Sequence, residues 1–468
     1  MTPQSLPRPP TGTDGYWHRR VWALAFPIII SNVSTPLLGM VDTAVVGHLP
    51  SAHYLGAVAI GAVIFSSIFW LFGFLRMGTS GLSAQAYGAG DTTESAAILG
   101  RALMTAVVLG TLLVILNAPI AAAAFSFFET TPAVESAAIV YYDIRLWAAP
   151  ATLVNYALLG WFLGMQRAGL GLVLQLILNV TNIILDLFFV IGLGWTVDGV
   201  ALASVLAEGV AAVVGLAIAF AMIRRGRTQW TSIWQRTRDS AAFIRLAVVN
   251  RDIFLRTLCL IAATLWFTRQ SARFGETTLA ATAILQQLHL FMAHALDGFA
   301  HAAQALIGRT VGARRRRDFI AAMRASTIWA GVAAAIFVVV YAVAGKSIVA
   351  LLTSLPEVRE TAAIYLPWAI MMPLAAVWSF QLDGIFIGAT WTRAMRNSMA
   401  VSLVVFLLAT WAAIPVLGVH GLWLAMVLFV LARAATLGSF LPALIRSIPD
   451  GPALQHPDPY PNPNRSQA

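Results

Sequence analysis

The chain is a series of long apolar stretches separated by short polar loops. We count twelve such stretches, each near the length of about 20 residues that an α-helix needs to cross a bilayer. The short alternating runs of a membrane β-barrel do not occur. The pattern therefore predicts an all-α membrane protein with twelve transmembrane helices. The predicted spans are 21–46, 54–75, 102–125, 146–165, 170–193, 199–222, 253–272, 279–304, 325–345, 361–388, 397–417 and 420–445.

The first apolar stretch contains an acid. It reads VWALAFPIIISNVSTPLLGMVDTAVVG from Val21 to Gly47, and Asp42 is its one ionisable residue. An unpaired carboxylate in hydrocarbon is costly, so such residues usually face a protein-lined cavity and bind an ion or a substrate. Asp42 is therefore a candidate functional residue.

A polar, arginine-rich segment divides the spans into two sets of six. This segment is the predicted basic cytoplasmic linker at 223–252. The other predicted parts are a cytoplasmic tail at 1–20, an amino lobe at 21–222, a carboxyl lobe at 253–445 and a disordered cytoplasmic tail at 446–468.

The two lobes look like repeats of each other. Gly160 and Gly164 recur as Gly384 and Gly388, at an offset of 224 residues that also relates other segments. Each lobe has an even number of spans, so both lobes enter the membrane from the same side. This arrangement predicts pseudo-symmetric lobes around a central cavity, as in alternating-access transporters. Both glycine pairs favour close helix packing.

Composition and charge support a membrane location. The chain is 59% hydrophobic and 11% charged, whereas soluble domains carry about 25% charged residues. Of the 30 Lys and Arg residues, 23 lie in the two tails or in loops after even-numbered spans. The positive-inside rule then places both termini in the cytoplasm. The net charge of +10 thus reflects topology, and nucleic acid is not an expected partner. The single cysteine, Cys259, excludes an intrachain disulfide.

The amino lobe gathers further polar residues. Asn182 and Asp186 of span 5 lie four residues apart on one helix face. Asn155 in span 4 and Ser204 in span 6 add neutral oxygens, and Glu208 follows one turn after Ser204. Two carboxylates with neutral oxygens suit Na⁺, and a buried pair of acids equally suits a shared H⁺. The alternative is a polar clamp between helices. Glu208 is either a second proton site or a hydrogen-bond partner.

The carboxyl lobe is polar at different positions. Span 8 places His294, Asp297 and His301 on one helix face. A third strong ligand is not evident, so the sequence predicts no metal site and favours a polar cavity wall.

Asp383 in span 10 is another intramembrane acid, and with Asp297 it is a secondary candidate for proton binding. Arg256 and Arg433 could neutralise these acids, which would make the charges of the carboxyl lobe structural. Nucleotide-binding and hydrolase motifs are absent from the sequence. Energy would then come from an ion gradient.

An ordered set of motifs resembles a known family. The motifs are MVDTAVVGHL, LRMGTSGLSAQAYGAGD, LLGWFLGMQ, NVTNIILDLFFVIGL, LDGFAHAAQALIG and LDGIFIGAT. Over about residues 20–440 they are similar to the multidrug and toxic compound extrusion (MATE) family, and more narrowly to its bacterial DNA-damage-inducible protein F (DinF) branch. The resemblance implies two six-helix lobes and cation-coupled efflux.

The resemblance also implies a cation site. In similar proteins the site uses an acid of helix 1, an Asn and an Asp of helix 5, a hydroxyl of helix 6 and an Asn of helix 4. These positions fall on Asp42, Asn182, Asp186, Ser204 and Asn155. Some members carry an essential acid in helix 7, where this chain has an arginine and no acid.

The expected function is secondary active multidrug efflux. The transporter would exchange organic, often cationic or amphipathic, drugs or toxic metabolites for H⁺ or Na⁺, with no cofactor besides this ion. It would work as a monomer in the bacterial inner membrane. The alternatives are a lipid-intermediate flippase, which would need a large cationic cavity, and a membrane-embedded hydrolase, for which His294, Asp297 and His301 are the one foothold. A passive channel would conduct without a gradient.

Overall fold

The computed structural model describes residues 14–47, 49, 51–126, 128, 131–226 and 229–449. Every regular element among these residues is a helix, as the apolar pattern predicts. Most of the two expected tails lies outside the described residues. The described end of the amino tail is helical, because α1 (Asp14–Val46) begins at Asp14.

The described helices account for the predicted spans. Ten segments are long and apolar enough to cross a membrane. Two further long helices, α1 and α11 (Ser240–Ala272), occupy the first and seventh predicted spans. The chain is therefore an all-α, multi-pass membrane protein. Several helices are longer than a bilayer requires: α13 (Arg316–Leu352) has 37 residues, or about 55 Å, against a hydrocarbon core of about 30 Å.

The chain forms two compact units, and the first extends from Ile30 to Ala247. Within it, α7 packs against α3, α4, α8 and α9. Apart from the second half of α1 and the start of α11, its elements are α2 (Ala52–Leu71), α3 (Phe74–Gly88), α4 (Thr92–Ile115), α5 (Asn117–Phe125), α6 (Pro132–Arg145), the 3₁₀ turn η1 (Leu146–Ala148), α7 (Ala149–Gly164), α8 (Ala168–Asp186), the π-helical η2 (Leu187–Gly192), α9 (Val197–Arg225) and α10 (Trp230–Thr237).

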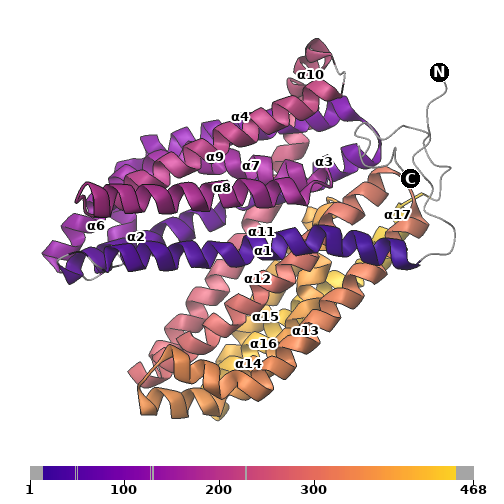
Figure 1. Ribbon diagram of the computed structural model, residues 1–468. Coiled ribbons are helices and arrows are strands. Elements are labelled where there is room, and N and C mark those ends of the chain that lie inside the picture. The colour runs from indigo at the N-terminus through magenta and orange to yellow at the C-terminus, as the bar shows by residue number, and fades with distance from the viewer. Residues whose placement is uncertain are drawn as a thin grey trace. The chain divides into compact units, whose positions relative to one another are not determined.

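The second unit combines the described residues up to Ile29 with those from Val248 onwards. Here α14 is central and packs against α12, α13 and α16. Figure 1 shows α12 to α16 running alongside one another. The elements after α11 are α12 (Glu276–Gly312), α13, α14 (Pro356–Gly388), α15 (Thr392–Leu417), α16 (Val419–Ser439) and α17 (Leu441–Ser447). The boundary between the units falls inside the expected linker, whose described residues include α10 and the start of α11.

The repeat predicted from the sequence is present in the helix packing. A Cβ atom at Gly160 would lie 2.3 Å from the carbonyl oxygen of Arg76, and one at Gly384 would lie 2.1 Å from that of Ala300. Both contacts are related by the same offset of 224 residues. The glycines thus allow α7 to touch α3 and α14 to touch α12 at backbone distance, which confirms the packing interpretation.

The loops follow the same repeat. Among the described residues, all those with positive φ except Gly275 form three pairs at the offset of 224: Gly90 and Arg314, Gln166 and Thr390, Gly194 and Gly418. Helix boundaries repeat as well, because α14 spans the positions equivalent to α6, η1 and α7 together. The backbone frame of each unit is therefore set by the duplicated sequence.

Candidate cation-binding site

The predicted acids of the amino lobe meet within the first unit. Asp186 at the end of α8 is fully buried, and Asn182 one turn earlier is 1% exposed. The carboxyl groups of Asp42 on α1 and Asp186 lie within hydrogen-bonding reach of each other. Ser204 on α9 completes the group through Asn182. We call these four residues the acid cluster.

The carboxamide of Asn182 connects the members of the acid cluster. In one orientation its nitrogen donates to Ser204 Oγ over 3.3 Å. In the other, the nitrogen donates to Asp42 Oδ1 over 3.2 Å and to Asp186 Oδ2 over 3.3 Å. The second orientation turns the amide oxygen away from the two carboxylates and satisfies both ends of the amide. The amide then offers N–H groups to the acids.

One oxygen of the acid cluster has no hydrogen-bond partner in the part of the chain that the structure describes. Asp186 Oδ1 is buried and accepts no hydrogen bond from the described residues. An unpaired carboxylate oxygen in a buried site costs free energy unless a proton or a cation binds it. A proton or a cation at this atom would remove that cost.

The remaining amino-lobe candidates form a separate pair. Asn155 on α7 donates from Nδ2 to Glu208 Oε2 over 2.7 Å and to the Glu208 carbonyl oxygen over 3.1 Å. The described contacts of Asn155 are thus with α9, and none of its hydrogen bonds goes to the acid cluster. Glu208 is thus a hydrogen-bond partner of Asn155, and its role as a second proton site stays a prediction.

An arginine of the first unit connects these two groups, although the sequence patterns assign it no role. Arg145 interacts electrostatically with Asp42, Asp186 and Glu208. Its guanidinium carbon lies 5.6 Å from the centre of the Phe65 ring and 5.9 Å from that of Tyr141. Its Nε and Nη1 atoms are buried without a hydrogen-bond partner among the described residues. The sequence signal that could have identified Arg145 was its position at the edge of an apolar stretch, where a cation needs acids nearby.

The helices have irregular geometry directly after Asp186 and Arg145. Asp186 is the last residue of α8 and directly precedes the π-helical η2. Arg145 is the last residue of α6 and directly precedes the 3₁₀ turn η1. Such local changes in helix winding are frequent at functional sites because they re-aim side chains and free backbone groups.

The secondary candidates lie in the second unit and are arranged differently. Asp383 accepts hydrogen bonds from Arg433 over 2.8 Å and from Arg256. The two arginines thus neutralise this acid, which is the structural role that the sequence suggests for them, and Asp297 interacts electrostatically with Arg433. Within the described residues, no group of three or more His, Cys, Asp or Glu side chains could hold a metal ion.

The histidines of α12 have separate hydrogen bonds. The Nδ1 atom of His294 lies 2.7 Å from the carbonyl oxygen of Leu290, and that of His301 lies 3.1 Å from Gln304 Oε1. These contacts connect each ring to its own helix.

Comparison with known proteins agrees with the fold. The MatE family model matches residues 27–188 and 253–411. The DNA damage-inducible protein F of Escherichia coli K12 is 42% identical over 90% of this chain and 91% of its own length. A probable multidrug resistance protein NorM of Caulobacter vibrioides is 24% identical over 90% of each chain.

Solved structures share the fold at low identity. A mutant of the Vibrio cholerae MATE transporter VcmN superposes with a TM-score of 0.81 at 19% identity, over 93% of this chain and 98% of that chain. A MOP superfamily transporter from Pyrococcus furiosus gives a TM-score of 0.76 at 18% identity, over 92% of this chain and 96% of that chain. The sequence matches and the helical membrane fold lead to one conclusion: this chain belongs to the MatE family, whose members are membrane transporters and not enzymes.

Proposed function

We propose that the chain is a secondary active efflux transporter that exchanges organic, cationic or amphipathic compounds for H⁺ by alternating access. The unpartnered Asp186 Oδ1 carries this proposal, since a buried carboxylate oxygen without a donor is a place for a proton. The names of the relatives support the substrate class, because one of them is a probable multidrug resistance protein. Proton uptake at the acid cluster would favour one conformation, and drug binding would favour the other.

The donor set favours H⁺ over Na⁺. A sodium ion requires several oxygens directed at one point. In its satisfied orientation the Asn182 amide directs its nitrogen, not its oxygen, at Asp42 and Asp186. Two carboxyl groups in hydrogen-bonding reach can share a single proton without further ligands.

Arg145 adds a fixed positive charge to this mechanism. When both acids are ionised, the guanidinium balances part of their charge. When the pair takes up a proton, only one negative charge remains, so the attraction between the acid cluster and Arg145 weakens relative to that between Glu208 and Arg145. Arg145 is the last residue of α6 and directly precedes η1. A change in the partners of Arg145 would therefore affect the junction between α6 and α7.

The test is ethidium efflux from proteoliposomes with an imposed pH gradient or Na⁺ gradient. The variants are Asp42→Asn, Asp186→Asn and Arg145→Gln, and Asp143→Asn is the control because it changes an exposed acid of α6. We expect the pH gradient alone to drive efflux in the wild type and in the control. Efflux should fall at least about tenfold in the two acid-cluster variants, since the proton site is lost.

Arg145→Gln should keep efflux but shift its pH dependence upwards, because the acid cluster then releases its proton less readily. Gradient-driven efflux that persists in Asp42→Asn and Asp186→Asn would refute the site. Efflux driven by Na⁺ instead would refute the proton assignment. Folded protein without any efflux would favour a lipid-intermediate flippase.

A further inference from the structure

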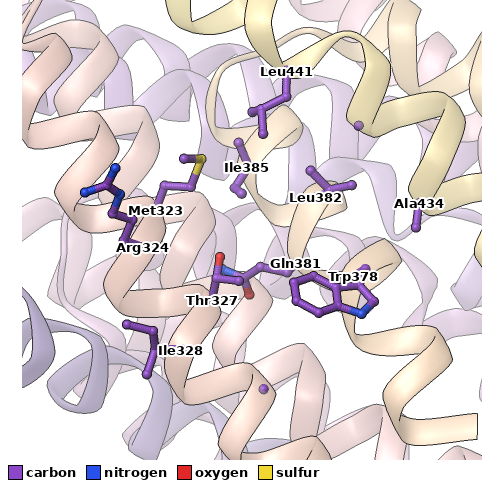
Figure 2. Close-up of a pocket in the computed structure, with 12 residues that line it drawn as sticks. Met323, Arg324, Thr327, Ile328, Trp378, Gln381, Leu382, Ile385, Ala434 and Leu441 are labelled. Carbon is purple, nitrogen blue, oxygen red and sulfur yellow. The ribbon is translucent and has the colours of Figure 1, made fainter.

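A cavity of about 720 Å³ lies in the second unit, between α13, α14, α16 and α17. Its volume is in the range of about 300–1,000 Å³ that is usual for ligand sites. Figure 2 shows its lining, which is apolar except for Arg324, Thr327 and Gln381. The cavity includes neither the acid cluster nor Asp383, so the proposed exchange mechanism does not use it.

The cavity opens on the outer surface of the unit. Ile328 on α13 is 53% exposed and Trp378 on α14 is 52% exposed, although both line the cavity. Both helices are long and apolar enough to span the membrane, so an acyl chain is a suitable contact for this exposed apolar surface. An apolar lining that is open to the bilayer therefore suits a lipid tail.

The cavity has a cation at one side. Arg324 is exposed and forms no ion pair with any described residue. It comes two turns after the arginine run 314–317 and directly before the apolar span predicted at 325–345. This position places the guanidinium at the level of lipid headgroups, where basic residues attract anionic lipids.

A buried acceptor faces the same cavity. Gln381 is 2% exposed, and its Nε2 donates to Ser326 Oγ over 2.6 Å. Ser326 Oγ in turn donates to the Met323 carbonyl oxygen over 3.0 Å. This chain of bonds fixes the orientation of the amide, and Gln381 Oε1 is left buried without a donor among the described residues. A ligand that offers an O–H or N–H group would satisfy it.

We propose that this cavity is a binding site for an anionic, hydroxyl-bearing phospholipid of the phosphatidylglycerol type. Arg324 binds the phosphate, and Gln381 Oε1 accepts a hydrogen bond from a headgroup hydroxyl. Arg324 and Gln381 both line this cavity, so a headgroup bound there is near both side chains. One acyl chain lies against Ile328, Trp378 and Leu382. A cationic drug is the poorer occupant, because Arg324 repels it.

The test uses purified protein in detergent with added phosphatidylglycerol or phosphatidylcholine, and native mass spectrometry counts the retained lipid. We expect the wild type to retain one phosphatidylglycerol in preference to phosphatidylcholine. Arg324→Gln should reduce that preference about fivefold, the effect of one basic residue near an anionic headgroup. Arg393→Gln is the matched control, since Arg393 is exposed in the same unit and does not line the cavity.

A second variant tests the cavity itself. Gly331 lines the cavity and a Cβ atom there meets nothing within 4 Å, so Gly331→Phe adds a bulky side chain at the cavity wall. This variant should lose the bound lipid. Its melting temperature should stay near that of the wild-type protein measured without added lipid. Gly169→Phe is the control at an equally open glycine of α8. The proposal would be overturned if Arg324→Gln and Gly331→Phe kept the wild-type preference for phosphatidylglycerol. It would also be overturned if ethidium bound without displacing lipid and this binding was lost in Gly331→Phe.

Discussion

Asp186 of the first unit and Asp383 of the second are both buried acids on membrane-spanning helices, yet their partners differ. Asp383 is held by two arginines. Asp186 lies beside a second acid and keeps one oxygen without a donor among the described residues. The two units share a duplicated backbone but not these charges, because Thr410 occupies the position equivalent to Asp186 and Leu159 that equivalent to Asp383. Neutralised charge stabilises a structure, whereas unneutralised charge is free to bind an ion.

Helix regularity follows the same division. In the first unit, α6 and α7 are joined through the 3₁₀ turn η1, and α8 continues as the π-helical η2. In the second unit, α14 and α15 cover the equivalent positions without a change of winding. The unit that contains the acid cluster is thus also the unit with breaks in these helices, where a conformational change has the lowest cost.

The difference between the two buried acids is tested most strongly by replacing each aspartate with asparagine. Asp383→Asn leaves two buried arginines without their acid, so we expect a loss of about 3–5 kcal/mol in the free energy of unfolding. Asp186→Asn removes one of two like charges and should change stability by less than about 1 kcal/mol, although it abolishes coupling. Thermal and denaturant unfolding of the purified variants would measure both. Equal destabilisation would mean that the acid cluster is structural.

A smaller effect should be equal in the two units. Gly160→Ala and Gly384→Ala each place a Cβ atom against a backbone carbonyl. Each should cost about 1–3 kcal/mol, since a backbone contact cannot relax as a side chain does. Gly331→Ala, which meets no atom within 4 Å, is the control. Melting temperatures would show whether the loss is shared. A loss at one glycine alone would show that only that unit depends on the close packing.

The smallest expected difference concerns two equivalent helix starts. Asp91 caps α4 by accepting a hydrogen bond from the Glu94 amide over 2.9 Å, and it pairs with Arg236 of α10. At the equivalent position α13 has Arg315, whose side chain makes no capping bond. Asp91→Ala should therefore cost about 1 kcal/mol, and Arg315→Asn should gain about 0.5 kcal/mol. Unfolding measurements that gave the same sign for both would remove this difference between the units.

Asp91→Asn separates the two roles of that residue. Asparagine caps a helix as well as aspartate does, but it lacks the charge for Arg236. Because Asp91 and Arg236 are both exposed, the variant should lose less than about 1 kcal/mol.

The sequence by itself determined the fold class, the duplication and most of the acid cluster. Bilayer thickness fixes the length of a spanning helix, so apolar runs of that length show the spans directly. An offset that recurs in glycine pairs is visible in the residue numbers alone. The four-residue spacing of Asn182 and Asp186 placed both on one helix face.

Tertiary structure decided how the buried charges are paired. Asn155 was expected beside the acids, but its hydrogen bonds go to Glu208. Arg145 received no role from the sequence because its partners come from α1, α8 and α9. Spacing along one helix fixes the face on which a side chain lies, but not what a neighbouring helix brings to that face. The pairing of Asp383 with two arginines and the open oxygen of Asp186 are properties of helix packing, which brings together residues far apart in the chain.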